Sequence, residues 1–127
     1  MTGVQTCALP ISAVAEGADA AIPGIAVADT IKQVASKQVA GNQSAGARHV
    51  VHTPDRASLV AVQTPQAFRA EVLRAAHVGA DDATDDAGLV ERNGGTVVVV
   101  PGDPRSRKVT DRDDLVVLEA WLAEDDR

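Results

Sequence analysis

The chain has 127 residues, of which 45% are hydrophobic and only 2% aromatic, so it can form one compact domain whose core depends on small aliphatic side chains. Its 18 acidic and 12 basic residues give a formal net charge of -6, the wrong sign for binding nucleic acid through its phosphates. No segment approaches the roughly 20 consecutive apolar residues that span a bilayer. We therefore expect neither a nucleic-acid partner nor a membrane-spanning segment. The single cysteine, Cys7, cannot form an internal disulfide, and no spacing of His and Cys residues indicates a metal site.

Residues 1–11, MTGVQTCALPI, resemble the in-frame translation of a sequencing-library adapter. The segment lacks the basic start and long apolar stretch of a signal peptide, and Pro10 is expected to interrupt any helix there. We therefore expect residues 1–11 to be an artefact and residues 12–127 to be the natural protein.

The first elements expected are strands. Residues 18–27 are apolar with a Pro-Gly break, which indicates a buried strand with a bulge or bend. Two β-capable runs, 31–39 and 48–53, flank the polar segment 41–46, a pattern typical of a hairpin. An isolated hairpin is at best marginally stable in water, so we expect it to pack on another chain.

A strand and two helices are expected next. Residues 59–62 favour a short strand, and Thr64 with Pro65 predicts a helix that Thr64 caps. Its apolar stripe would be Phe68, Val72, Ala75 and Ala76. A second helix is predicted over residues 84–92, which Asn93-Gly94-Gly95 would end.

The last elements complete an α/β pattern. Residues 96–100 have strong β-propensity without alternation, so we expect a strand that is covered on both faces. The final helix should begin at Thr110, with Asp113 reaching back as in a capping box. Its apolar face would be Leu115, Leu118 and Leu122. About three sheet strands are fewer than usual, so the sheet is expected to be incomplete.

Five short polar segments lie where the expected elements begin or end, within reach of a ligand. They are DTIK at 29–32, HTPDR at 52–56, VQTPQ at 62–66, ATDDA at 83–87 and RKVT at 107–110. In this order and spacing they resemble the 2-C-methyl-D-erythritol 4-phosphate cytidylyltransferase family over about residues 18–122.

The resemblance implies a fold and a reaction. The fold would be the C-terminal part of a Rossmann-like nucleotidyltransferase domain, of α/β class, without its N-terminal strands. It would carry a projecting β-arm, about residues 31–56, through which two subunits form a homodimer. The parent enzyme would join CTP and 2-C-methyl-D-erythritol 4-phosphate to give CDP-methylerythritol and pyrophosphate in non-mevalonate isoprenoid biosynthesis, with Mg²⁺ as cofactor and in the cytoplasm.

The resemblance also implies roles for five residues. Thr30 and Arg56, at the base of the arm, would bind the substrate phosphate in the partner's active site. Thr64 and Thr84 would line the sugar-alcohol pocket, and Lys108 would meet phosphate charge near the reacting centre. All five are thus expected to bind substrate, with Arg56 and Lys108 as the catalytic cations.

These roles suit the chemistry of nucleotidyl transfer. Joining a phosphate oxygen to the α-phosphorus of CTP brings two anions together, so the reaction needs fixed cations and in-line positioning. Arg56 can grip a phosphate through two donors, and Lys108 supplies a compact charge. Threonine hydroxyls and free N–H groups at the expected helix starts add polar contacts without charge.

Two sets of differences from the family pattern bear on function. Ser106 and Arg107 precede Lys108 where the family usually has Asn-Ile, and Ala67 replaces a frequent glycine. The Gly-rich loop that would bind CTP, and an Asp-containing segment that helps to place Mg²⁺, belong to the family's first half and match nothing here. This chain alone is therefore expected to be inactive, with most Mg²⁺ ligands elsewhere in the parent enzyme.

Alternative interpretations stay open at this point. Taken singly, Thr64 and Thr84 are ordinary N-caps, Arg56 is a turn residue, and Lys108 is a solvated charge. A ribitol 5-phosphate cytidylyltransferase would share these segments. In another class, the chain could be a non-catalytic dimerisation module built on the arm.

Overall fold

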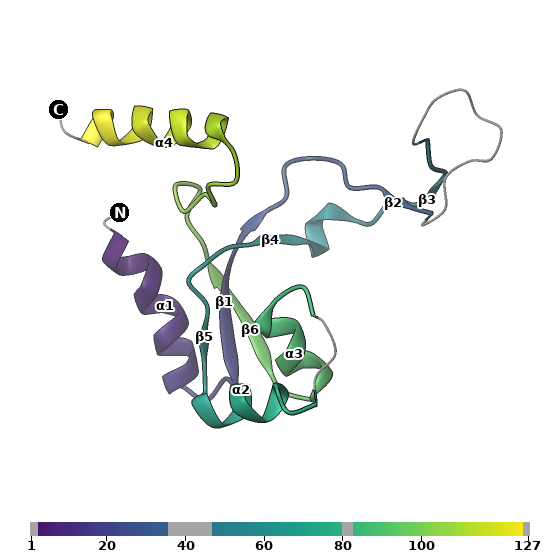
Figure 1. Ribbon diagram of the computed structural model, residues 1–127, viewed down its shortest axis with the longest axis vertical. Coiled ribbons are helices and arrows are strands. Elements are labelled where there is room, and N and C mark those ends of the chain that lie inside the picture. Colours follow the sequence, from purple (N-terminus) through teal and green to yellow (C-terminus); the bar gives the residue numbers. More distant parts are fainter. Residues whose placement is uncertain (1–2, 36–46, 80–82, 126–127) are drawn as a thin grey trace. The chain divides into compact units, whose positions relative to one another are not determined.

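The computed structural model describes residues 3–35, 47–79 and 83–125. The chain combines helices with strands, two of which pair in parallel, and is of the α/β class, as predicted (Figure 1). The chain divides into two compact units. The first is formed by Met1–Ile25 together with Val62–Arg127, and the second by Ala26–Ala61.

The first unit is built on strand β1 (Ala20–Ala26). Strand β6 (Val97–Pro101) pairs with β1 in parallel, and β5 (Ala67–Phe68) pairs with it antiparallel. The sheet has the order β4–β1–β5, where β4 is Val60–Val62. The strands predicted at 18–27, 59–62 and 96–100 are thus confirmed. The bulge expected in the first of them is absent, because the parallel register continues unbroken through Pro23 and Gly24.

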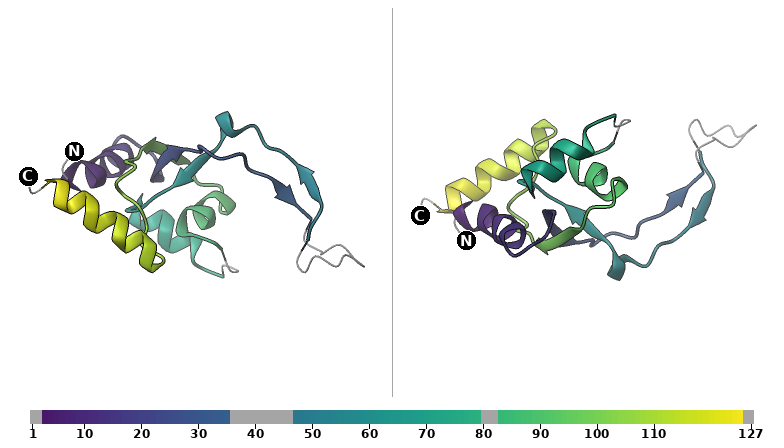
Figure 2. Two further views of the ribbon diagram at one scale, coloured as in Figure 1. Left: turned by 90° about the horizontal axis from the view of Figure 1, so that it is seen from above. Right: turned by 90° about the horizontal axis from the view of Figure 1, so that it is seen from below.

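Three helices pack on these strands. Helix α1 (Gly3–Ala15) contacts β5 and β6, whereas α2 (Ala70–Ala76) and α3 (Asp86–Arg92) contact each other, and α3 contacts β6. Figure 2 shows α1 on one side of the strands and the α2–α3 pair on the other. The core cluster consists of small aliphatic side chains, Ala20, Ala76 and Val90, with partly buried Phe68, Val72, Leu73, Leu89 and Val97 around it.

Helix α1 contains Pro10, so the prediction that this proline would interrupt a helix is wrong. Pro10 is among the largest fully buried side chains of the described residues. Burial of its ring offsets part of the cost of the missing backbone hydrogen bond.

Within the described residues, every helix is too short or too polar to span a bilayer.

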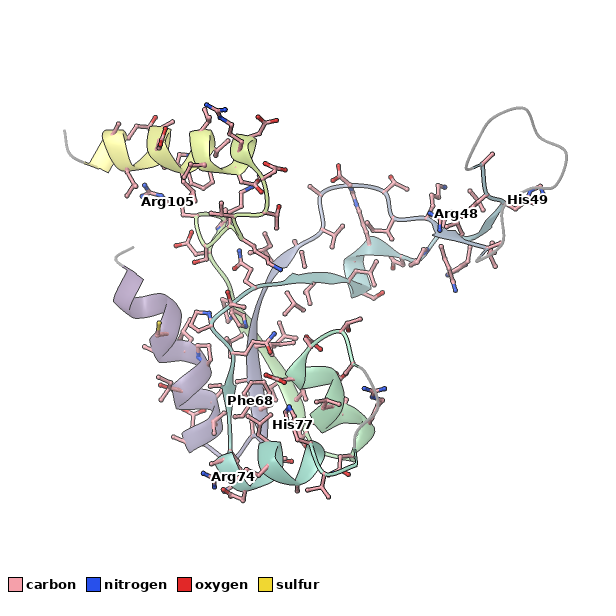
Figure 3. All side chains as sticks on the ribbon, in the orientation of Figure 1. Arg48, His49, Phe68, Arg74, His77 and Arg105 are labelled. Carbon is pink, nitrogen blue, oxygen red and sulfur yellow. The ribbon has the colours of Figure 1, made fainter. Side chains whose placement is uncertain are left out.

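The helix predicted to start at Thr64 begins later. Thr64 and Pro65 are joined by a cis peptide bond, and α2 begins at Ala70 with Arg69 at its N-cap position. Phe68 belongs to β5 and lies among the strands above α2 (Figure 3). Pairing of Ala67 and Phe68 with β1 therefore overrides the local helix-start signal at Thr64.

The other two predicted helix starts are also displaced. Asp85, not Thr84, caps α3, because its carboxylate accepts from the N–H of Gly88 at 2.9 Å. Helix α4 (Arg112–Asp125) has Asp111 at its start, whose carboxylate accepts from the N–H of Asp114 at 2.9 Å. The capping box expected between Thr110 and Asp113 is therefore wrong. Aspartate is at least as good an N-cap as threonine, so the nearer Asp takes the position in both cases.

Some apolar surfaces of the first unit stay exposed. Val99 in β6 is 50% exposed, so the prediction that residues 96–100 are covered on both faces is wrong at that position. In α4, Leu115 and Leu122 are 47% and 64% exposed. The expected apolar face of α4 is present, but within the described residues it packs only in part.

The second unit contains the predicted hairpin. Strands β2 (Gln33–Val34) and β3 (Val50–His52) pair antiparallel, with a register irregularity between Gln33 and Val34. The N–H of Ala35 donates to the carbonyl of His49 and extends the pairing. The predicted pairing is confirmed. The predicted tip, 41–46, lies outside the described residues, as do residues 36–39 of the first predicted run.

Candidate functional site

Arg56 opens a short 3-10 helix, η1 (Arg56–Ser58), in the second unit. Asp55 caps this turn, with its carboxylate accepting from the N–H of Ala57 at 3.0 Å. The guanidinium of Arg56 donates through Nη1 to the carbonyl of Ala28 at 2.6 Å. One donor of the guanidinium is thus fixed to the backbone of the segment before Thr30, and the side chain as a whole is exposed.

An open hollow of about 640 Å³ lies beside Arg56 in the same unit. Its lining comes from residues 26–28, 55–57, 59 and 60; Arg56 supplies the charged donor and Asp55 the opposite charge. Thr30 is exposed and does not line the hollow, although Ala28 does. Farther along, Lys32 Nζ donates to the hydroxyl of Thr53 at 2.8 Å and joins the two sides of the hairpin base. The hollow can receive an anionic group at the free edge of the guanidinium.

Lys108 lies in the first unit, on a loop that joins β6 to α4. The amide of Gln63 binds the start of this loop through three hydrogen bonds. Its Nε2 donates to the carbonyls of Asp103 at 2.7 Å and Ser106 at 3.1 Å, and its Oε1 accepts from the N–H of Asp103 at 3.0 Å. Gln63 is fixed in turn, because its own N–H donates to the carbonyl of Pro23 in β1 at 2.8 Å.

Asp114, in the first turn of α4, binds the end of the same loop. Its carboxylate accepts from the N–H of Thr110 at 3.0 Å, from the hydroxyl of Thr110 at 2.7 Å and from Nε of Arg107 at 2.6 Å. Asp114 is only 4% exposed, while Arg107 is about half exposed. Arg107 and Thr110, the two residues that Asp114 binds, flank Lys108 in the sequence. The side chain of Lys108 itself is exposed.

The ionisation of Asp114 follows from these contacts. The hydrogen bonds from Thr110, and then the bond from Arg107, hold the pKa of the Asp114 carboxyl well below its usual range. Burial alone would raise that pKa, so the hydrogen bonds outweigh desolvation. Asp114 is therefore an anion at neutral pH, and it partly neutralises the basic stretch around Lys108.

The two threonines of the expected pocket occupy different places in the first unit. Thr64 is exposed and follows Gln63 directly, so it is one residue from the side chain that fixes the Lys108 loop. Thr84 is exposed and precedes the cap of α3. The structure therefore links Thr64 to the Lys108 loop through Gln63, and Arg56 to the backbone next to Thr30. Thr84 takes no part in either set of contacts.

In the described residues, His, Cys, Asp and Glu side chains nowhere gather in a group of three or more that could hold a metal ion. Mg²⁺ is usually held by one or two carboxylates together with substrate phosphates and water.

The prediction from sequence missed two residues, Gln63 and Asp114. Gln63 lies within the VQTPQ segment, but an amide carries no charge and gives no local signal of its partners. The Thr-x-x-Asp spacing predicts a capping box with Asp113, and nothing in the sequence distinguishes Asp114 from it. Both bind backbone atoms or hydroxyls whose positions depend on the folded loop.

The sequence is similar to known proteins over nearly its whole length. Residues 4–124 match the family model described as 2-C-methyl-D-erythritol 4-phosphate cytidylyltransferase. A curated protein of that name from Streptomyces coelicolor is 50% identical over 121 residues, 94% of this chain and 43% of the relative. Another from Saccharopolyspora erythraea is 52% identical over 114 residues, 89% of this chain and 46% of the relative. The chain thus spans less than half the length of these relatives.

Solved structures agree with the sequence relatives. The crystal structure of 2-C-methyl-D-erythritol 4-phosphate cytidylyltransferase from Thermus thermophilus is 32% identical, with a TM-score of 0.72 over 92% of this chain and 54% of that one. The crystal structure of 4-diphosphocytidyl-2C-methyl-D-erythritol synthase from Anaerococcus prevotii is 26% identical, with a TM-score of 0.78 over 94% of this chain and 50% of that one. The fold of this chain therefore corresponds to about half of the fold in those proteins.

Proposed function

The chain belongs to the 2-C-methyl-D-erythritol 4-phosphate cytidylyltransferase family, and from this premise we propose that it forms the alcohol-phosphate-binding part of such an enzyme. The parent enzyme joins CTP to 2-C-methyl-D-erythritol 4-phosphate and releases pyrophosphate, in isoprenoid biosynthesis. A phosphate oxygen of the alcohol phosphate attacks the α-phosphorus of CTP, and the bond from that phosphorus to the pyrophosphate oxygen breaks. The product is CDP-methylerythritol.

The observation that carries this proposal is that two separate short loops, each held by hydrogen bonds, present an exposed cation. Arg56 is held by the carbonyl of Ala28 beside an open hollow. Lys108 lies on a loop that Gln63 and Asp114 bind from its two ends. Fixed positive charge is the main requirement of a reaction between two phosphate anions, because it stabilises the transition state without acid or base groups.

Individual roles follow within this proposal. Arg56 and Thr30 bind the phosphate of the alcohol substrate in the partner's active site, Thr64 and Thr84 contact the hydroxyls of the substrate in their own subunit's pocket, and Lys108 neutralises charge at the reacting phosphates there. Arg56 and Lys108 act as the catalytic cations. Exposure of all five side chains within the described residues is compatible with ligand binding.

The remaining parts of the proposal concern the complete enzyme. Its nucleotide loop and most of its Mg²⁺ ligands lie outside this chain, so the chain alone is inactive. Residues 12–127 form the C-terminal part of a single domain, and the hairpin, about 31–56, is the arm of a cytoplasmic homodimer. The apolar residues Val50 and Val51, which are 57% and 64% exposed, support a partner at this hairpin.

The test uses a protein of the relatives' full length that carries this chain. It should release pyrophosphate from CTP with 2-C-methyl-D-erythritol 4-phosphate, and much more slowly with ribitol 5-phosphate. The opposite preference would assign the enzyme to the ribitol phosphate class. No release with either alcohol phosphate would favour the non-catalytic dimerisation module.

The site assignment has its own test. Arg56→Ala should raise the KM for the alcohol phosphate by about tenfold to a hundredfold, because a charge-assisted pair of hydrogen bonds is lost. The KM for CTP should change little. An unchanged KM for the alcohol phosphate would remove Arg56 from the proposed site.

A further inference from the structure

The loop that carries Lys108 has no regular secondary structure between β6 and the start of α4. An exposed lysine on such a loop could occupy many positions. In those where its ammonium group lies away from the reacting phosphate, its electrostatic effect would be smaller. The loop is nevertheless fixed at both ends by side chains. This raises the question of what the fixing residues do in the reaction.

Gln63 fixes the first half of the loop over a large sequence separation. Its three hydrogen bonds reach Asp103 and Ser106, which are 40 and 43 residues away. The fit is close, because a Cβ added at Gly102 would overlap Oε1 of Gln63 and lie 3.1 Å from the backbone of Gly24. The side chain of Gln63 is part-buried, so its amide would be costly to leave without partners.

Asp114 fixes the second half of the loop. It binds both the backbone and the hydroxyl of Thr110, and also the guanidinium of Arg107. Arg105 adds a third attachment, since its Nη2 donates to the carbonyl of Trp121 in α4 at 3.2 Å. Figure 3 shows the side chain of Arg105 beside α4. These bonds reach residues near Lys108 and none of them involves Lys108 itself, so they hold its backbone and do not occupy its ammonium group.

We propose that Gln63 and Asp114 are positioning residues of the nucleotidyl-transfer site, which act on catalysis through Lys108. This inference rests on the proposed function and adds two residues to its machinery. Gln63 also connects two parts of the site, because it directly precedes Thr64. Movement of the Thr64 segment and movement of the Lys108 loop are therefore coupled through one amide.

A double-mutant cycle tests the proposal in the full-length enzyme. Gln63→Glu keeps the acceptor for the N–H of Asp103 but places an anion against two carbonyl oxygens. Asp114→Asn keeps the shape and removes the charge. Each should lower kcat/KM by about tenfold to a hundredfold, mainly through kcat. In a Lys108→Met background the same changes should cost less than about threefold, because groups that act through one residue are not additive.

Asp113→Asn is the matched control for Asp114→Asn. Asp113 is exposed, carries the same charge and lies in the same turn of α4, so it should leave kcat/KM unchanged. Full and additive losses in the Lys108→Met background would show a general structural role and overturn the proposal. So would an unchanged kcat/KM in the Gln63 and Asp114 variants.

Hydrogen exchange provides a second measurement that does not depend on activity. Amides of Asp103, Arg105 and Ser106 should exchange faster in Gln63→Glu, and those of 107–110 faster in Asp114→Asn, while α2 and α3 keep their protection. Unchanged exchange at 103–110 would overturn the proposal. A wild-type enzyme without pyrophosphate release would instead refute the proposed function, and the exchange experiment would still decide whether the two side chains hold the loop.

Discussion

Two short loops present the proposed catalytic cations, and they are held in opposite ways. The turn at Arg56 is fixed by neighbours in sequence, since Asp55 caps it and the hydroxyl of Ser58 donates to the Asp55 carbonyl at 2.7 Å. There the cation itself is anchored, to Ala28. The Lys108 loop is fixed by Gln63 and Asp114, and the cation is left free of those contacts. Within the proposed function, Arg56 would serve as a fixed docking point, whereas Lys108 would be held in position through its loop, with its ammonium group left available for the reacting phosphates.

Lys108→Met should have the largest effect. It removes a charge at the reacting phosphates, so kcat of the full-length enzyme should fall by about a hundredfold to a thousandfold, with a smaller change in KM. Arg56→Ala should show the reverse distribution, with KM for the alcohol phosphate affected more than kcat. Steady-state kinetics with the alcohol phosphate varied will separate the two patterns. If both variants change KM alone, the distinction between docking and reacting cations fails.

Gly102→Ala should have an intermediate effect. The added Cβ overlaps Oε1 of Gln63, so the amide must move and its bonds to Asp103 and Ser106 weaken. We expect kcat/KM to fall by about tenfold, while the KM for the alcohol phosphate, to which Arg56 contributes, stays unchanged. In a Gln63→Ala background, where the clashing atom is gone, Gly102→Ala should cost less. An equal cost in both backgrounds would show that the glycine matters for its close approach to Gly24 instead.

The smallest expected effect is on stability and its pH dependence. Because hydrogen bonds lower the pKa of Asp114 in the folded protein, its stabilising contribution is present above the unfolded-state pKa, about 3.9. That contribution is lost as the pH falls further towards the lower folded-state pKa. Thermal unfolding of the wild type and Asp114→Asn should therefore differ by a constant Tm interval between pH 7 and about pH 5. The interval should narrow below about pH 4.

Asp113→Asn serves again as the control, with a Tm close to that of the wild type at each pH. A Tm difference for Asp114→Asn that persists unchanged into acid would mean that Asp114 stabilises α4 by packing and not by its charge. In that case the charge of Asp114 would not contribute to holding the Lys108 loop.

Much of the fold could be predicted from local patterns. The strands near 20–26, 60–62 and 97–101 and the pairing of the hairpin were identified because β-propensity and turn residues act over a few neighbouring positions. The helix expected at Thr64 was not found, because Ala67 and Phe68 gain more by pairing with Ala20 and Ala21 in the sheet. The starts of the last two helices were predicted to within about two residues, since several adjacent Asp and Thr side chains compete for each cap.

The residues of the candidate site also fall into two groups: those that the sequence indicates, and those whose contacts only the folded structure reveals. The residue types of Thr30, Arg56, Thr64, Thr84 and Lys108 and their order are properties of the sequence, and they were sufficient to indicate phosphate chemistry and the family. Asp114 binds residues within seven positions of it in the sequence, whereas the partners of Gln63 were decided by tertiary structure alone. Gln63 meets Asp103 only after β1 has brought together two segments 40 residues apart. A neutral amide can bind any exposed backbone group, so only the fold determines which groups it reaches.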